Sequence, residues 1–371
     1  MRKGRNSLVK PDWSGLAASL CSIVIGLLVG FVVLAACNPS QAGNGIRTLL
    51  LGGVTGGMKG LGNVLYYAMP IIMTGLGVGL AFQTNLFNIG GSGQFIVGSF
   101  FALYAAIKFD FPGPLGWIVP LVAGALGGAL WALLPGLLRA YLKVNIVIAT
   151  IMMNYIGMYL VNYMVKQTIY DSLKGQSQVI PAGHTLPYAG MDLLFPNSMA
   201  NIGILIAAVM AVLVYILMNK TTFGFELKAC GKNSEASRYA GINEKRNIVL
   251  SMMISGALIG LGGALMYLSP AGKYLKVVDV LAAEGFNGIP VALLAMNHPI
   301  GIVFTAIFIA YMQVSGFYMQ TYRFSPEIVN IIIAVIIYFS AFSLIIKSLI
   351  GQLKLRLASR RAGSGKEVEV K

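Results

Sequence analysis

Neutral hydrogen-bonding side chains interrupt a long apolar run near the start of this sequence. Residues 75–98 read GLGVGLAFQTNLFNIGGSGQFIVG, with amides, hydroxyls and glycines gathered between Gln83 and Gln94. Successive glycines and serines disfavour helix, so the run predicts two helices separated by a break. Non-helical backbone at membrane depth is tolerated only where it is buried in protein or lines a water-filled cavity. Two interpretations stay open: a site for a neutral solute such as a sugar or nucleoside, or a tight turn between helices.

A second interrupted run, residues 281–299, reads LAAEGFNGIPVALLAMNHP. Glu284 is ionisable in an apolar context, and a buried ionisable residue in a membrane segment is costly and therefore a candidate for function. If a helix begins near Val280, however, Glu284 lies in its first turns and could instead complement the helix dipole. The sequence leaves both roles open.

A third segment is charged and lies between two apolar runs. Residues 223–246 read FGFELKACGKNSEASRYAGINEKR. The order Asn233-Ser234-Glu235 predicts a short helix capped by Asn233 or Ser234. A short amphipathic helix between two spans is suited to docking a soluble partner. The alternative is a solvated basic loop that only sets orientation.

The elements that position these segments are membrane helices. The chain is 57% hydrophobic and only 11% charged, whereas soluble domains carry roughly 25% charged residues. An apolar stretch of about 20 residues crosses a bilayer as a helix. Nine such stretches are Ser14–Ala36, Gly62–Phe82, Gln94–Phe109, Pro114–Leu138, Asn145–Val165, Met199–Met218, Ile248–Leu268, Ile300–Gln320 and Pro326–Ile346. Leu281–Met296 is a tenth, interrupted candidate.

The basic residues test this count, because cytoplasmic loops are enriched in Lys and Arg. With ten crossings and both termini in the cytoplasm, 19 of the 27 Lys and Arg residues fall inside and 8 outside. The net charge of +15 is then mainly an orientation signal that also favours contact with anionic lipid. We therefore expect no nucleic-acid partner. The fold class predicted is an all-α polytopic membrane protein of about 10 transmembrane helices, one or two of them broken or re-entrant.

Several chemistries find no support in the sequence. The three cysteines and two histidines are scattered, so neither a disulfide framework nor a metal site is expected. No phosphate-binding loop of the form G-x-x-x-x-G-K-[ST] is present, nor a chain of intramembrane acids for proton relay. A catalytic cluster for a membrane enzyme is not visible either. Leu34-Ala35-Ala36-Cys37 resembles a lipoprotein processing site, but the long apolar run before it favours an uncleaved helix.

At these three runs the sequence resembles the permeases of binding-protein-dependent ABC importers, in the branch of ribose, galactose and nucleoside permeases. The similar stretches are LFNIGGSGQ, ELKACGKNSEASRYAGIN with SGALIGLGGAL, and GFNGIPVALLAMNHPIG, and with the spans they cover roughly residues 60–345. The resemblance is strongest to nucleoside permeases of the guanosine type. One position departs from it: Ser92 stands where many relatives carry an acid before Gly93.

The resemblance implies partners and roles. It implies a cytoplasmic ATPase of double-domain type, a second permease subunit as homo- or heterodimer, and an extracytoplasmic substrate-binding lipoprotein, all in a bacterial cytoplasmic membrane. The chain itself binds no cofactor, since the partner subunit uses the ATP. The predicted parts are a cytoplasmic tail 1–13, a permease domain 14–346 with a coupling loop 220–247, and a cytoplasmic tail 347–371. The residues assigned to the substrate pathway are Asn85, Phe87, Asn88, Gln94, Glu284, Phe286 and Asn287, and those assigned to ATPase coupling are Lys232, Asn233, Glu235, Arg238 and Tyr239.

Overall fold

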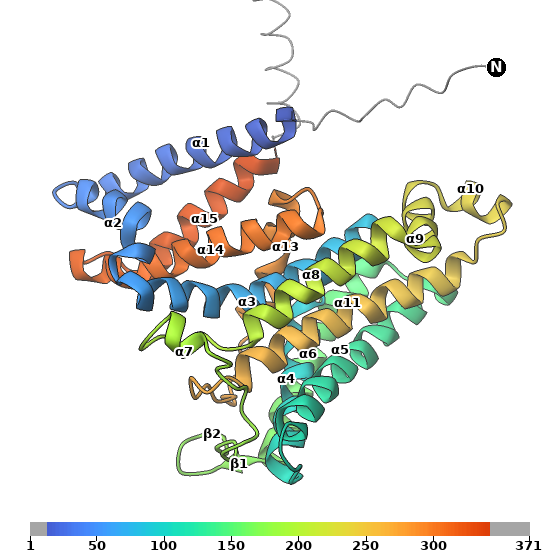
Figure 1. Cartoon of the computed structure of the whole chain (residues 1–371). Helices are drawn as coiled ribbons and strands as arrows, with labels where there is room; N and C mark the ends of the chain where they lie inside the picture. Colours follow the sequence, from blue (N-terminus) through green and yellow to red (C-terminus); the bar gives the residue numbers. More distant parts are fainter. Residues whose placement is uncertain (1–12, 342–371) are drawn as a thin grey trace, which may run out of the picture. The chain divides into compact units, whose positions relative to one another are not determined.

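The computed structural model describes residues 13–341, and its architecture is helical (Figure 1). Six helices within these residues are long and apolar enough to cross a membrane. They are α3 (Gly57–Gln83), α5 (Leu115–Leu142), α6 (Ile146–Thr168), α8 (Gly203–Lys220), α11 (Glu244–Tyr267) and α14 (Pro299–Met319), the last extended by the 3-10 turn η1 (Gln320–Tyr322). Each overlaps one predicted span, so the prediction of an all-α membrane protein is confirmed.

Three further predicted spans are also helical. α4 (Gly91–Lys108) has 18 residues, while α1 (Trp13–Cys37) and α15 (Pro326–Ala341) contain shorter apolar stretches among the described residues. The remainder of the last predicted span and both predicted tails beyond residues 13–341 lie outside the described residues. The predicted tenth segment, Leu281–Met296, is two short helices, α12 (Ala283–Phe286) and α13 (Gly288–Leu294).

The sequence prediction missed one helix, α2 (Ala42–Thr55). Asn44, Arg47 and the pair Gly52-Gly53 dilute its apolar residues, so no continuous hydrophobic run marks it. The helix forms nonetheless because Gly52 and Gly53 allow its backbone to approach α14: a Cβ at Gly53 would overlap the ring of Tyr311. The Gly53 amide also donates to Ser315 Oγ at 3.0 Å.

Contacts divide the described residues into two units, residues 13–46 with 324–341, and residues 47–323. In the first unit α1 and α15 pack closely. A Cβ at Gly26 would overlap Ile336, and a Cβ at Gly30 would overlap Ile332. Small residues at such points let two membrane helices approach, because lipid provides no hydrophobic force to drive them together.

In the second unit α11 is central and packs against α3, α4 and α5. Glycines bring α11 and α5 into backbone contact: a Cβ at Gly256 would overlap the carbonyl of Gly128, and one at Gly260 that of Gly124. Dispersion contacts between backbones replace side-chain packing here. The two helices therefore form one closely joined pair.

The helices α5, α6 and α11 run between two distinct ends of this unit (Figure 1). At one end, here called the α10 end, α9 (Thr222–Lys232) and α10 (Ser234–Tyr239) precede α11. At the other, the hairpin end, β1 (Tyr170–Asp171) pairs antiparallel with β2 (Gln176–Ser177), and the short α7 (Met191–Leu194) precedes α8. The Leu186 amide donates to Leu268 O at 2.9 Å, which ties the hairpin-end loop to the end of α11.

Candidate functional site: two broken membrane segments and an exposed helix

The break after α3 is partly enclosed between helices, with buried and exposed residues side by side. Residues 84–90 are not helical, and Asn88 is fully enclosed. Asn88 Nδ2 donates to Gln94 Oε1 at 3.0 Å and to Ser255 Oγ at 2.9 Å, a position midway along α11. Asn88 Oδ1 accepts from Gln94 Nε2 at 3.1 Å and from the Gly90 amide at 3.0 Å. One of these bonds satisfies the backbone amide of Gly90, and the others fix Asn88 inside the protein, where an interruption of helix is tolerated.

Helix α6 fixes the break from the other side. Asn154, itself buried, donates from Nδ2 to Ile89 O at 3.0 Å and accepts from the Gly93 amide at 2.8 Å. Ser92 Oγ, also buried, has no hydrogen-bond partner among the described residues. The sequence prediction grouped Asn88 and Gln94 with the substrate pathway. In this conformation their amides are occupied by each other and by the fold.

Asn85 and Phe87, the two other predicted pathway residues of this break, are exposed. Asn85 adopts a left-handed backbone conformation, φ 57°, which asparagine tolerates better than most residues. It lines a hollow of about 390 Å³ together with Lys232, Asn233 and other residues at the α10 end. Phe87 is 43% exposed and stacks on Phe82 with ring centroids 4.8 Å apart. The structure therefore places Asn85 beside the predicted coupling residues.

The second break meets the first. Glu284, Phe286 and Asn287 are half-buried, and between them Gly285 lies against the backbone of Gly91 and Ser92, where a Cβ would overlap both. Gly288 is similarly close to Thr74 in the middle of α3. Two segments about 190 residues apart in sequence, both predicted as pathway segments, are thus in backbone contact.

The second break also runs along α3 toward the α10 end. After its contact with Thr74 it continues through α13, and Gln83 Nε2 at the end of α3 donates to Asn297 O. Met296 and Asn297 adopt left-handed conformations, φ 50° and 59°, so the chain turns sharply there before α14. Residues 285–297 therefore extend from mid-α3 to its last residue without forming one continuous helix.

Glu284 lies near a charged aromatic cluster toward the hairpin end. Lys273 Nζ sits 5.9 Å from the ring centroid of Tyr66 and 5.4 Å from that of Tyr67, within the range of cation–π attraction. Burial lowers the pKa of Lys273, and the negative charge of Glu284 partly offsets this. Glu284 is also in the first turn of α12. Glu284 therefore lies both at the start of a helix, where it complements the helix dipole, and near a cationic side chain. Both roles that the sequence left open for it remain open.

The predicted short helix of the coupling loop is present as α10. Asn233 is its N-cap, since its Oδ1 accepts from the Ala236 amide at 3.0 Å, which confirms one of the two predicted caps. Tyr239 is 95% exposed and Glu235 and Lys232 are exposed as well. Arg238 Nη2 lies 3.7 Å from Glu244 Oε2, at the start of α11. The structure thus leaves most of α10 exposed at one end of the bundle.

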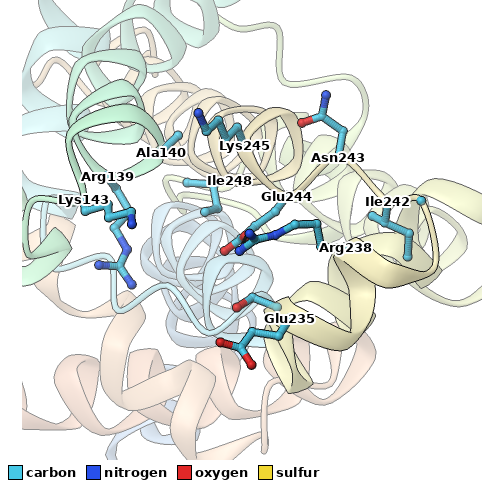
Figure 2. Close-up of a pocket in the computed structure, with 12 residues that line it drawn as sticks. Arg139, Ala140, Lys143, Glu235, Arg238, Ile242, Asn243, Glu244, Lys245 and Ile248 are labelled. Atoms are coloured by element: carbon cyan, nitrogen blue, oxygen red, sulfur yellow. Dashed lines mark ion pairs between the residues drawn. The ribbon is translucent and has the colours of Figure 1, made fainter.

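A hollow of about 790 Å³ separates α10 from the end of α5 (Figure 2). Arg139 of α5 and Lys143, which follows that helix, border it on one side, and Glu235, Arg238 and Glu244 border it on the other. In the sequence, Arg139 and Lys143 contribute only to the excess of basic residues that orients the chain. Their place beside α10 could not be read from the sequence, because it depends on how α5 packs on α11. Among residues 13–341, no group of three His, Cys, Asp or Glu side chains could hold a metal ion.

Comparison with known proteins assigns this arrangement to a class. Residues 60–341 match the family described as branched-chain amino acid transport system / permease component, and the chain belongs to that family. It is therefore a membrane-spanning permease component of ABC transporters.

Individual relatives are similar over nearly the whole chain. The guanosine ABC transporter permease protein NupP of Bacillus subtilis is 35% identical, with 93% of this chain and 99% of the relative covered. The nucleoside ABC transporter permease protein NupB of Lactococcus lactis is 36% identical, with 92% and 94% covered. The glucose ABC transporter permease protein TsgB13 of Haloferax volcanii is 27% identical, with 89% and 88% covered. The chain matches no solved structure.

Proposed function

We propose that this protein is a permease subunit of an ABC importer that carries nucleosides, purine nucleosides among them, across a bacterial cytoplasmic membrane. The observation that carries the proposal is the near full-length similarity to two permeases named for guanosine and nucleoside transport. The similarity to the glucose permease is lower. The first broken segment, residues 83–94, carries amides and hydroxyls but no ionisable side chain, which suits an uncharged solute.

The proposed assembly has four kinds of part. The chain supplies one half of the membrane pathway, and a second permease subunit, identical or related, supplies the other. A cytoplasmic ATPase, of double-domain type by resemblance, docks on α10, and an extracytoplasmic lipoprotein delivers substrate to the hairpin end. The exposure of Glu235, Arg238 and Tyr239 on α10 supports the contact with the ATPase. The chain binds no ATP itself, since its sequence has no phosphate-binding loop.

The proposed topology has ten crossings with both termini in the cytoplasm. Nine helices supply single crossings, and the interrupted segment at α12 and α13 supplies the tenth. Its course from mid-α3 to Gln83 supports passage through the half of the membrane next to the α10 end. The excess of Lys and Arg at the α10 end agrees with a cytoplasmic location for α10. Domain limits of 1–13, 14–346 and 347–371 accompany this topology.

Transport follows from alternating access. Closure of the ATPase pair would displace α10. Helix α11 would pass the displacement to the first broken segment, where Asn88 bonds Ser255, and Gly285 would carry it on to the second. Asn85, Phe87, Glu284, Phe286 and Asn287 are proposed to line the route in one or more of its states. Asn88 and Gln94 would join them only if their mutual bonds open during the cycle.

The test is reconstitution of the full complex in liposomes with ATP inside. We expect uptake of labelled guanosine that requires the ATPase and the binding lipoprotein. Uptake of glucose or ribose in place of guanosine would contradict the substrate assignment. Guanosine uptake driven by a proton or sodium gradient without ATP would contradict the importer class. The charge-reversed variant with Glu235→Lys and Arg238→Glu should lose coupling; full uptake by that variant would contradict the docking site.

A further inference from the structure

Helix α6 carries a row of tyrosines on its exposed side. Tyr155, Tyr159 and Tyr163 are spaced four residues apart and are 47%, 57% and 63% exposed. Residues four apart lie on one face of a helix and rise about 6 Å per step. Among the residues that the structure describes, none forms a hydrogen bond with these three hydroxyls. The row therefore presents three open phenols along one line.

Depth makes this row unusual for a lipid-facing surface. α6 begins at Ile146 and has 23 residues, which places the three tyrosines about 13, 20 and 26 Å along the helix. Tyrosine is enriched at the two membrane interfaces, where its hydroxyl reaches water. Tyr163 could occupy such a belt. Tyr155 and Tyr159 lie too near the middle of a hydrocarbon core about 30 Å thick, where an unpaired hydroxyl is unfavourable.

The other exposed helix faces show what the lipid side of this protein looks like. On α5 the exposed side chains in the central turns are Leu126, Leu130 and Leu134, all aliphatic. On α8 they are likewise aliphatic, from Leu205 to Ile216. Exposed hydroxyls at mid-helix therefore distinguish the α6 face from two comparable faces of the same protein. We conclude that this face meets water or another polar surface.

Close packing against a neighbouring helix does not suit the α6 face. Membrane helices associate through small residues that allow close approach. The exposed side chains of central α6 are all bulky: Met152, Tyr155, Ile156, Tyr159, Leu160 and Tyr163. Its small residues, Ala149 and Gly157, are buried on the opposite side, where Asn154 holds the broken segment. The α6 face thus lacks the small residues through which α5 and α11 approach each other.

We propose that Tyr155, Tyr159 and Tyr163 line the substrate route and stack on the base of a nucleoside in transit. This rests on the proposed function and adds a site to it. Aromatic rings spaced about 6 Å apart give the base successive stacking surfaces, with hydroxyls available to the ribose. No ionised side chain lies on α6 between its first residue and Lys166, which suits a neutral solute.

The first test is accessibility to a membrane-impermeant thiol reagent. The complete complex is prepared with its native cysteines in this chain replaced by serine, and either Tyr159→Cys or Leu130→Cys is added. Leu130 is a matched control, since it is 60% exposed and also central in its helix. We expect Tyr159→Cys to react at least about tenfold faster, because the reactive thiolate forms in water and not in hydrocarbon. Guanosine with its binding lipoprotein should slow the reaction.

Two results would overturn the proposal. Equal, slow labelling of both variants would mean that α6 faces lipid. An unreactive Tyr159→Cys that cross-links to the second permease subunit would mean that α6 is a closed interface. Both can occur while the unaltered complex imports guanosine, so they are separable from failure of the proposed function, which would abolish import by the unaltered complex.

Transport selectivity gives the second test. Replacing Tyr159 by Leu removes the ring, whereas replacing it by Phe keeps it. Loss of one stacking contact should reduce guanosine uptake at least about fivefold, and Phe should restore most of it. Equal uptake by the Leu and Phe variants, or an equal loss in Leu130→Ala, would contradict a stacking role.

Discussion

The paired amides of Asn88 and Gln94 lead to a prediction about coupled stability. Asn88 makes four hydrogen bonds, two of them to Gln94, and Gln94 makes its side-chain bonds to Asn88 alone. Side-chain hydrogen bonds within membrane proteins contribute on average about 0.6 kcal/mol each. Asn88→Ala should therefore lower the free energy of unfolding by about 2.4 kcal/mol, and Gln94→Ala by about 1.2 kcal/mol.

The double variant tests whether Asn88 and Gln94 stabilise the protein through shared hydrogen bonds or independently. Because the two bonds lost in Gln94→Ala are also lost in Asn88→Ala, the double variant should cost about 1.2 kcal/mol less than the sum of the single variants. Reversible unfolding in mixed micelles with increasing SDS measures the three values. Additivity within about 0.3 kcal/mol would refute the reasoning. Normal stability with impaired guanosine uptake would instead indicate that the amides contact substrate.

Three further outcomes are expected. Gly260→Ala should destabilise the protein by about 1–3 kcal/mol in the same unfolding assay, because its Cβ would overlap the backbone of α5. The control is Gly43→Ala, which should have little effect since no atom lies within 4 Å of a new Cβ there. Equal effects of the two substitutions would contradict the glycine contact. Asn233→Ala should speed amide exchange in α10 about fivefold, from the loss of about 1 kcal/mol of capping, and unchanged exchange would contradict the cap. Exchanging the charges of Glu235 and Arg238 should weaken ATPase binding in a salt-dependent way, and salt-independent weakening would point to misfolding.

Apolar run length predicted most of the fold because a helix alone satisfies its backbone in lipid. Polar residues and glycines in otherwise apolar segments predicted both breaks, although Gly91 and Ser92, poor helix formers by propensity, begin α4. Run length failed for α2, whose glycines serve contact with α14. Helix α2 depends on tertiary contacts, and its sequence shows no continuous hydrophobic run that would predict it.

The candidate site divides in the same way. The Asn233 cap could be predicted because capping is local and depends on neighbouring residues. The burial of Asn88, the exposure of Asn85 and the hollow beside Arg139 could not, because each depends on which helices pack together. The α6 tyrosines are visible in the sequence as a four-residue repeat, but only exposure separates an open row from a buried one. Their roles remain predictions to be tested by labelling and transport.

The glycine contact between α5 and α11 also has a mechanical consequence. Because Gly256 and Gly260 hold α11 against the backbone of α5, we expect α11 to tilt as one rigid body between α10 and the hairpin end. Its 24 residues make an arm of about 36 Å, and a tilt of about 5° about the α10 end would move Tyr267 by about 3 Å. Leu268 is hydrogen-bonded to Leu186, so that displacement would reach the loop at the hairpin end without any change within α11 itself.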